Sequence, residues 1–244
     1  MDTKRAAAGA DSGRALHPVL RARAFDGSNS SAMVQMLTEK QQAELGSIAT
    51  EVSFRRRVTV YEAGAPAQSV FIVKEGMVKA HRDLSSGRLR VLAFLFPGDL
   101  FGLAEDGRYV NSVQTVMPTT CFKIPIGALT DIFLRDSDFQ LQFLIKTTHE
   151  LREAQRQQIV LTRLGASARV AMFLRMLQRR DDTDSSRIEL AMSRADIARY
   201  LGLSSESVTR AFGRLVREGI VAFPSLHVAQ ILNRSRFERL ALAA

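Results

Sequence analysis

The feature that most constrains this 244-residue chain is a stretch without proline or glycine, from Asp136 to Arg163. At 1.5 Å per residue it predicts a single helix of roughly 40 Å, longer than most helices of globular proteins. Within this stretch, six residues recur at alternating intervals of three and four, which is the spacing of a coiled-coil seam. They are Leu144, Thr147, Leu151, Ala154, Gln158 and Leu161. We expect residues 136–164 to form a two-fold dimer seam, weakened by Thr147 and Gln158. The alternative is a long helix packed on its own domain.

The composition and periodicity of the sequence differ before and after this helix. Residues 1–31 mix arginines, small residues and turn formers without periodicity, which predicts a disordered tail. They contain no apolar core of a secretory signal, although a weak transit peptide fits their composition. A helix is expected to begin near Thr38. Short β-branched and aromatic runs separated by turn residues then predict an antiparallel β-barrel within residues 32–135. Residues 165–244 predict a small mixed domain, so the fold class is α+β.

The charge of the chain favours polyanionic partners. The formal net charge is +9 and the pI about 10.4, which points to nucleic acid first and to an acidic membrane second. The single cysteine excludes an intrachain disulfide or a four-thiolate cluster and fits a reducing, cytoplasmic location. No run of about 18 apolar residues is present, so no membrane-spanning segment is expected.

One C-terminal segment predicts a winged helix-turn-helix. "MSRADIARYLGLSSESVTRAFGRLVREGIV" reads as two short helices joined at Gly202, where a left-handed turn favours a residue without a Cβ. Ser193 with Asp196 three residues later predicts the cap of the first helix, and Ser204 that of the second. The following "GIVAFPSLHVAQIL" predicts two short strands around Pro224–Ser225, which would form the wing.

The polar side of the second helix carries the predicted base contacts. Its first two turns are the part that enters the major groove in this motif. Arg210 can donate two hydrogen bonds to guanine, Glu206 can accept from cytosine, and Thr209 can offer a hydroxyl or a methyl group. Predicted phosphate or peripheral contacts are Ser205, Ser207, Arg194, Arg199, Arg214 and Arg217. The alternative is that Glu206 and Arg210, four residues apart, form only a solvated helix pair.

Barrel, long helix and winged helix-turn-helix, in that order, resemble the CRP/FNR family of bacterial transcription regulators from about Leu37 onward. "FPGDLFGL" looks like the barrel turn of the family, and "ESVTR" looks like the E-x-x-S-R pattern of its FNR and FixK branch, with Thr209 in place of serine. Ser205 stands where the CRP branch carries arginine. The resemblance implies a homodimeric activator that binds double-stranded DNA at the inverted repeat TTGAT-N4-ATCAA. It also implies contact with RNA polymerase, through "DLSSGR" (83–88), and no membrane partner.

The same resemblance bears on cofactors. Members that bind cyclic AMP carry Gly-Glu after the "PGD" turn and Arg-Ser further on, where this chain has Gly102–Leu103 and Asn111–Ser112. A nucleotide phosphate would then be buried without a charged partner, which is costly. We therefore expect that the barrel does not bind cyclic AMP. An iron–sulfur cluster on four cysteines is not expected either, because the chain has a single cysteine. The alternative is a ligand-gated sensor whose barrel binds a small molecule or haem, as in nitric-oxide sensing, and which is inactive without it. A further rival is a helical protein whose basic face docks on another protein or an acidic membrane.

The residues available for metal binding or catalysis are few and scattered. His17, His81, His149 and His227 show no ligand spacing, so no metal site and no cofactor is expected. His81 is the only histidine in the barrel and is expected to be solvated, although haem can use one axial histidine. Cys121 lies in an apolar run and is expected to be a buried packing residue, with a redox role as the alternative. No Ser/His/Asp or paired-carboxylate constellation is evident, so we expect no catalytic residues and no enzyme.

Overall fold

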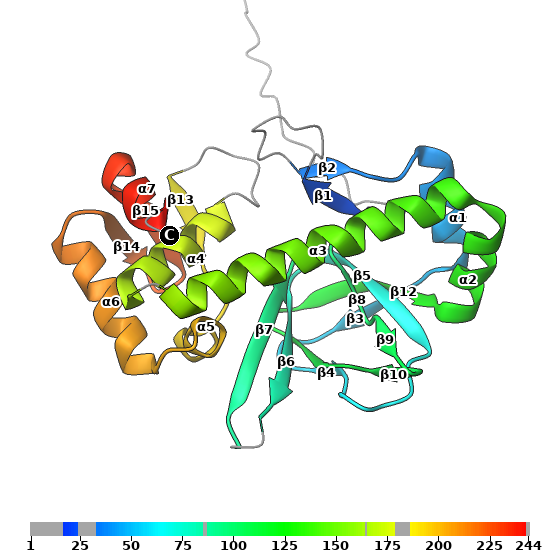
Figure 1. The fold of residues 1–244 in the computed structure, drawn as a ribbon, viewed down its shortest axis with the longest axis horizontal. Helices are drawn as coiled ribbons and strands as arrows, with labels where there is room; N and C mark the ends of the chain where they lie inside the picture. The colour runs from blue at the N-terminus through cyan, green and yellow to red at the C-terminus, as the bar shows by residue number, and fades with distance from the viewer. Residues whose placement is uncertain (1–16, 24–32, 85–86, 164, 179–185, 243–244) are drawn as a thin grey trace, which may run out of the picture.

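The computed structural model describes residues 17–23, 33–84, 87–163, 165–178 and 186–242 (Figure 1). A single long helix, α3 (Ser137–Arg163), runs along the molecule. The β-barrel lies against the first part of α3, and the C-terminal domain lies beyond its other end (Figure 1). The long helix predicted from Asp136 to Arg163 is thus confirmed, one residue shorter at its start.

The barrel consists of two four-stranded antiparallel sheets, with strand orders β4-β11-β6-β7 and β3-β12-β5-β8. The strands are β3 (Thr50–Phe54), β4 (Thr59–Tyr61), β5 (Ser69–Glu75), β6 (Val78–Asp83), β7 (Leu89–Leu95), β8 (Leu100–Phe101), β11 (Ser112–Thr115) and β12 (Thr119–Pro125). A small hairpin, β9 (Ala104–Glu105) and β10 (Arg108–Tyr109), lies between β8 and β11. At Gly76, between β5 and β6, φ is +88° and a Cβ would collide with the carbonyl of Pro118, so this turn requires glycine.

The predicted disordered tail is wrong for residues 17–23. Leu20 is fully buried, and β1 (Arg21–Arg23) pairs antiparallel with β2 (Met33–Gln35). The Arg21 amide also donates to the Gly98 carbonyl at 3.2 Å. Burial of Leu20 and these long-range hydrogen bonds stabilise a segment whose local sequence has no regular pattern. The remainder of the predicted tail, residues 1–16 and 24–31, lies outside the described residues.

Three helices surround this end of the barrel. Helix α1 (Glu39–Ile48) begins at the predicted cap, because Thr38 Oγ1 accepts from the Gln41 amide and the Gln41 side chain accepts from the Thr38 amide. Helix α2 (Ile126–Arg135) was not predicted, and it packs against α3 through its apolar side. On α3, Lys146 is fully buried, forms an ion pair with Asp99 at 3.1 Å and donates to the Arg21 carbonyl at 2.6 Å. This lysine therefore joins α3 to both the barrel and the N-terminal hairpin.

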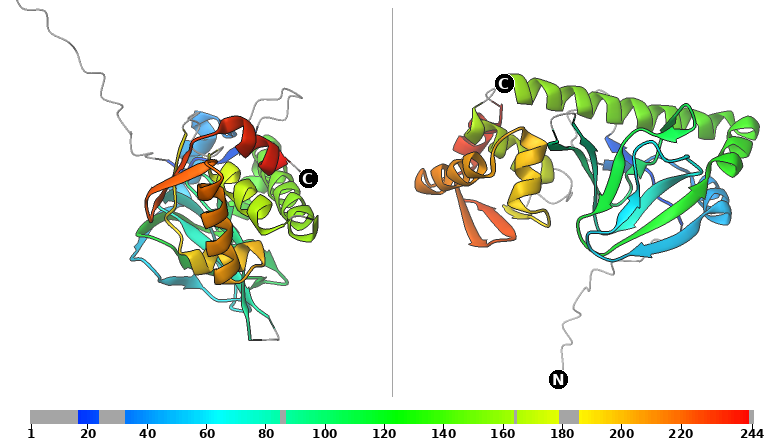
Figure 2. Two further views of the ribbon diagram at one scale, coloured as in Figure 1. Left: turned by 90° about the vertical axis from the view of Figure 1, so that its left-hand side faces the viewer. Right: turned by 90° about the horizontal axis from the view of Figure 1, so that it is seen from below.

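The C-terminal domain combines helices with a three-stranded sheet of order β13-β15-β14. Its elements are α4 (Ala166–Gln178), β13 (Arg187–Glu189), α5 (Arg194–Leu201), α6 (Ser205–Arg217), β14 (Val221–Ser225), β15 (Val228–Ile231) and α7 (Arg234–Leu242). Val170, Leu201, Leu215 and Phe237 belong to its buried core. The two predicted wing strands are confirmed as β14 and β15, while β13 and α7 were not predicted individually. Seen from below, α3 lies along one edge with barrel and C-terminal domain on one side of it (Figure 2, right).

Candidate nucleic-acid interface

Helix α5 and the turn after it follow the predicted helix-turn-helix geometry. Ser193 Oγ accepts from the Asp196 amide at 3.1 Å and caps α5. The helix ends at Gly202, which has φ 63° and ψ 37°, the left-handed conformation. An ideal Cβ on Gly202 would lie 2.7 Å from Arg90 Nη1, a side chain of the barrel. Sequence reasoning missed this barrel residue, since Arg90 and Gly202 are far apart in the chain.

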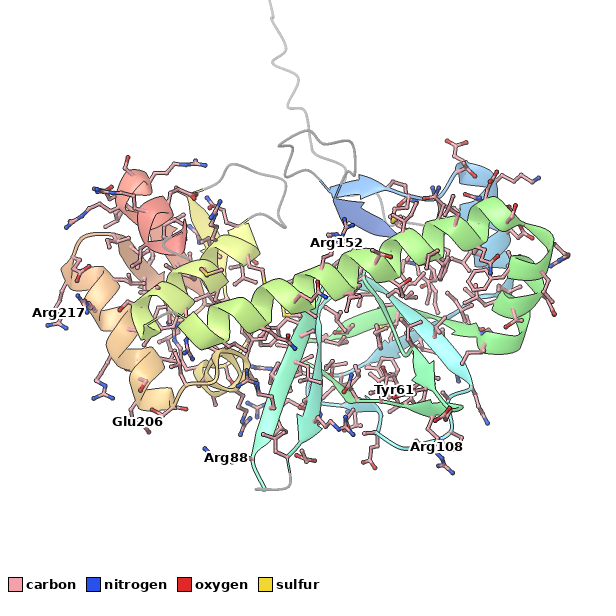
Figure 3. The ribbon with its side chains drawn as sticks, viewed as in Figure 1. Tyr61, Arg88, Arg108, Arg152, Glu206 and Arg217 are labelled. Carbon is pink, nitrogen blue, oxygen red and sulfur yellow. The ribbon has the colours of Figure 1, made fainter. Side chains whose placement is uncertain are left out.

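Helix α6 is held by one strongly apolar side. Ser204 Oγ accepts from the Ser207 amide at 3.1 Å and caps the helix. Val208, Ala211, Phe212 and Leu215 are buried at three- and four-residue spacing. The other side of α6 is therefore directed outward, and Figure 3 shows Glu206 and Arg217 projecting from the molecule there.

The three predicted base-contact residues lie together on this outward side. Glu206, Thr209 and Arg210 are all exposed in the first two turns of α6. Thr209 Oγ1 donates to the Ser205 carbonyl at 2.9 Å, so its hydroxyl is engaged within the helix and its methyl group remains for an outside contact. Arg210 donates to Ser207 Oγ at 3.4 Å.

Glu206 is held in its charged form. Its own backbone N–H and the Ser204 hydroxyl donate to its carboxylate and lower its pKa, and the Arg210 charge lowers it further by a smaller amount. The alternative reading, a solvated pair between Glu206 and Arg210, thus corresponds to a weak electrostatic contact. It leaves both groups at the surface.

The predicted backbone contacts differ in their surroundings. Arg217 is exposed, Arg199 lies 3.4 Å from Asp196, and Arg214 forms an ion pair with Glu218 at 2.7 Å. Arg194 is instead half-buried, with its guanidinium 3.8 Å from the ring centroid of Phe212 and 4.9 Å from that of Phe223. This stacking joins α5 to α6 and to the wing. Ser205 is exposed and Ser207 is partly exposed.

The predicted dimer seam lies on an open side of α3. Leu144 and Leu151 are 61% and 59% exposed, although both are apolar. Ala154 and Gln158 are also exposed, and Thr147 and Leu161 are partly exposed. A neighbouring side of α3 carries the buried Phe139, Phe143 and Lys146. One side of α3 thus packs on the barrel, as the alternative reading expects, while the predicted seam lies on a side that the chain leaves uncovered and stays a prediction.

The described residues contain no group of three or more His, Cys, Asp or Glu side chains arranged to hold a metal ion. Cys121 is fully buried, and burial raises the pKa of its thiol to about 12, so it stays protonated at neutral pH. This environment fits a packing residue. Within the same described ranges, no helix combines the length and the apolar content needed to cross a bilayer.

Comparison with known proteins agrees with this geometry. Residues 51–136 match the family of cyclic nucleotide-binding domains, and residues 168–240 match the Crp-like helix-turn-helix domain. The chain is 30% identical to the nitrogen fixation regulation protein FixK of Azorhizobium caulinodans, over 80% of this chain and 81% of that protein. It is 32% identical to the transcriptional activatory protein AadR of Rhodopseudomonas palustris, over 82% and 84%.

Solved structures show the same arrangement. The structure of FixK2 from Bradyrhizobium japonicum aligns with a TM-score of 0.76 and 34% identity, over 81% of this chain and 99% of that chain. A CooA mutant from Carboxydothermus hydrogenoformans, 19% identical with a TM-score of 0.68, shares the fold over 80% of this chain and 88% of that one. The barrel, the long helix and the winged helix-turn-helix, together with these relatives, show that the chain belongs to the CRP/FNR family of DNA-binding transcription regulators and is similar to FixK.

Proposed function

We propose that the chain is a homodimeric transcription activator that binds an inverted repeat of the type TTGAT-N4-ATCAA. The observation that carries this proposal is the outward side of α6, where Glu206, Thr209 and Arg210 are exposed together on a helix anchored by its buried side. Arginine fits guanine O6 and N7, a carboxylate accepts from the cytosine amino group, and the threonine methyl fits the thymine methyl. Those three base contacts match the TTGAT half-site.

The open side of α3 supports the proposed dimer. Exposed leucines on a long helix lose contact with water when they pair with a second copy. A two-fold axis along this seam would present two copies of α6 to two inverted half-sites. Half-sites read by such dimers lie about one helical turn apart on the duplex.

The interior of the barrel supports DNA binding without a ligand. The rings of Tyr61 and Tyr109 stack at 3.7 Å and those of Phe71 and Phe101 at 5.2 Å, so the side chains of the barrel contact one another. Tyr109 also donates to the Ser69 carbonyl at 2.8 Å. Ser112, where cyclic AMP-binding relatives carry a serine after an arginine, accepts from the Ala63 amide at 3.0 Å. The aromatic rings and the hydroxyls of Tyr109 and Ser112 therefore have their contacts within the chain itself.

Contact with RNA polymerase is assigned to the end of the β6–β7 hairpin. Arg82, Asp83 and Leu84 are exposed there, and Arg88 is exposed on the return strand. Figure 3 shows Arg88 near the end of the hairpin that projects furthest from α3. A charged tip with an exposed leucine fits a protein partner better than solvent alone.

Fluorescence anisotropy on purified protein tests the proposal. The probes are a TTGAT-N4-ATCAA duplex and a scrambled duplex, at one fixed salt concentration of about 150 mM, because non-specific binding falls steeply with salt. We expect a preference on the order of 10³-fold without any added ligand. Equal binding to both duplexes would overturn the proposed site and favour the ligand-gated alternative. Selection from random duplexes would then identify the sequence that the protein binds.

A further inference from the structure

We propose that the β6–β7 hairpin of the barrel fixes the orientation of the helix-turn-helix, and that Lys79 is a positioning residue for DNA binding. The hairpin contacts α5 in its first turn, in its last turn and at the residue that caps its C-terminal end. Each contact joins a barrel side chain to the domain that carries α6. The inference rests on the proposed function in two respects, since it assumes the homodimer and uses an inverted repeat as the probe.

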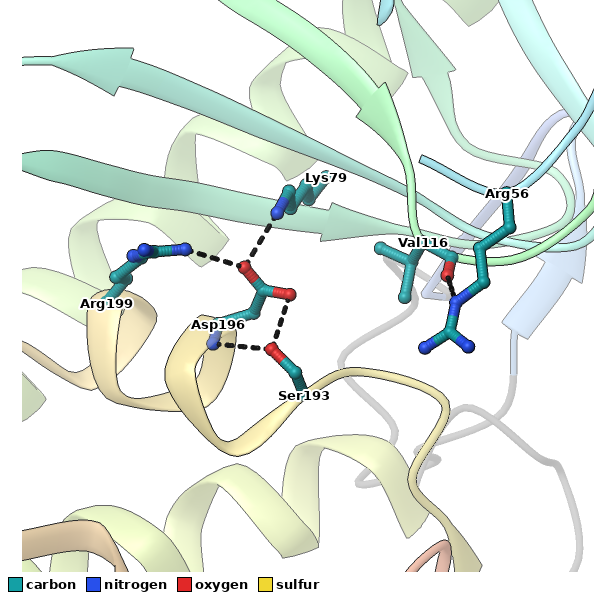
Figure 4. A network of polar contacts seen from close by, with 6 residues as sticks. All are labelled: Arg56, Lys79, Val116, Ser193, Asp196 and Arg199. Carbon is teal, nitrogen blue, oxygen red and sulfur yellow. Dashed lines mark hydrogen bonds and ion pairs between the residues drawn. The ribbon is translucent and has the colours of Figure 1, made fainter. Parts of the chain in front are cut away.

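The first contact lies at the beginning of α5. Lys79 Nζ is 2.6 Å from Asp196 Oδ1, and the two side chains are only 8% and 13% exposed. Asp196 Oδ2 accepts from Ser193 Oγ at 2.8 Å, and Arg199 lies 3.4 Å from Oδ1 (Figure 4). Burial acts to raise the pKa of Asp196, but hydrogen bonds from Lys79 and Ser193, with the charges of Lys79 and Arg199, lower it overall. The carboxylate that belongs to the cap of α5 thus also binds a lysine of the barrel.

The second contact is apolar and lies at the last turn of α5. The Phe94 ring of β7 is 5.3 Å from the Tyr200 ring and 6.0 Å from the Phe173 ring, measured between centroids. Met77, Val91 and Val116 of the barrel are buried in the same cluster as the core of the C-terminal domain. The two parts therefore share one hydrophobic core at this place.

The third contact lies at the end of α5. The guanidinium of Arg90 on β7 lies beside Gly202, and Arg169 of α4 donates to the Leu201 carbonyl at 3.1 Å. Positive groups stabilise the carbonyl end of a helix. Desolvation by burial and the nearby Arg169 charge lower the pKa of Arg90, as expected for a cation held inside an interface.

These contacts leave the reading side of α6 uncovered. Glu206, Thr209 and Arg210 are exposed while the hairpin holds α5, so the contact does not compete with DNA. In a dimer it would fix the distance and angle between the two copies of α6. A domain released from the hairpin would still bind one half-site, but it would lose the advantage of a preset spacing between two half-sites.

The test compares Lys79→Met with the matched variant Lys74→Met in the full-length protein. Lys74, on β5, has an equally buried side chain and pairs with the half-exposed Glu51 of β3, away from α5. Affinity is measured on the inverted repeat, on the same repeat with two base pairs added to the spacer, and on a single half-site. For Lys79→Met we expect at least about a tenfold loss on the inverted repeat, a much smaller preference for the original spacer, and unchanged half-site affinity. Lys74→Met should keep the affinity and the spacer preference of the unsubstituted protein. Lys79→Arg should retain most of both.

A retained spacer preference in Lys79→Met would overturn the inference, as would tighter binding by this variant. An equal loss on the half-site would also overturn it, because the effect would then lie in α6 itself. Hydrogen exchange of α5 without DNA supplies an independent measurement, and we expect faster exchange in Lys79→Met but not in Lys74→Met. If the unsubstituted protein shows no preference for the TTGAT repeat, the proposed DNA site is wrong. The role of Lys79 is then still decided by the hydrogen-exchange rates and by the spacer test on the duplex obtained by selection.

Discussion

At the scale of single residues, Asp196 shows which part of a site local sequence can predict. Its place three residues after Ser193 predicts the cap, and the Asp196 amide does donate to Ser193 Oγ. Its carboxylate has a second partner, Lys79, which is 117 positions away in the chain. No local pattern connects these two residues. Similarly, the sequence left open whether Thr209 offers its hydroxyl or its methyl group, and the bond to the Ser205 carbonyl favours the methyl.

Arg210→Ala tests the assignment of a base contact. We expect a loss of about 1–3 kcal/mol in DNA-binding free energy and relaxed selectivity at one base position, because a bidentate contact to guanine would be removed. The measurement is anisotropy on duplexes that differ at each half-site position. Arg217→Ala is the control, expected to weaken binding evenly on all duplexes and to reduce the steepness of the salt dependence by about 0.9 for each of the two subunits. An even loss for Arg210→Ala would make it a phosphate contact.

His81 predicts a pH dependence of stability. Burial and the Lys79 charge lower its pKa below 6.5, Arg199 lowers it further, and Asp83 and Asp196 oppose these effects. The unfolded chain therefore binds a proton first as the pH falls. The contribution of His81 to the unfolding free energy should be constant above about pH 7 and decline below 6.5, by at most about 1.4 kcal/mol per pH unit. Urea unfolding between pH 7.5 and 5.5 checks this, and His81→Asn should flatten the decline. An unchanged slope in that variant would contradict the assignment.

At the scale of elements, the sequence predicted those with a strong local pattern. The helix α3, the caps of α5 and α6 and the two wing strands follow from spacing, capping residues and turn formers. Helix α2 and the β1–β2 hairpin were missed because tertiary contacts form them. Helix α2 buries Leu129 and Ile132 only after the chain turns at Asp136 and brings α3 alongside. The β1–β2 hairpin depends on Lys146 and Gly98, which lie far away in sequence.

Leu151→Asp tests the seam of α3. A charge at the centre of the predicted interface should convert the dimer to a monomer at micromolar concentration, because the buried carboxylate would lack a partner. Sedimentation velocity measures the change. Leu226→Asp is the control, since Leu226 is also exposed, lies in the wing and should leave the dimer intact. A dimeric Leu151→Asp would place the interface elsewhere.

At the scale of the whole molecule, buried contacts form a continuous connection from α3 to α6. Lys146 joins α3 to Asp99 in the barrel, and the β6–β7 hairpin joins the barrel to α5. Helix α5 packs on α6 through the domain core, and Arg194 stacks on Phe212. The order of the three parts could be predicted from the sequence. Their mutual placement could not, because it depends on side chains such as Phe94 that resemble ordinary core residues.

Phe94→Ala tests whether the barrel and the C-terminal domain unfold together. Since Phe94 contributes to the shared core, its truncation should cost about 3–5 kcal/mol. It should also split a single thermal transition into two, measured by calorimetry at one fixed protein concentration because dimerisation stabilises the folded state. Phe71→Ala is the control, since Phe71 is buried inside the barrel and its loss should lower the midpoint while keeping one transition. A single transition in Phe94→Ala would mean that Lys79–Asp196 and Arg90 suffice to couple the two parts.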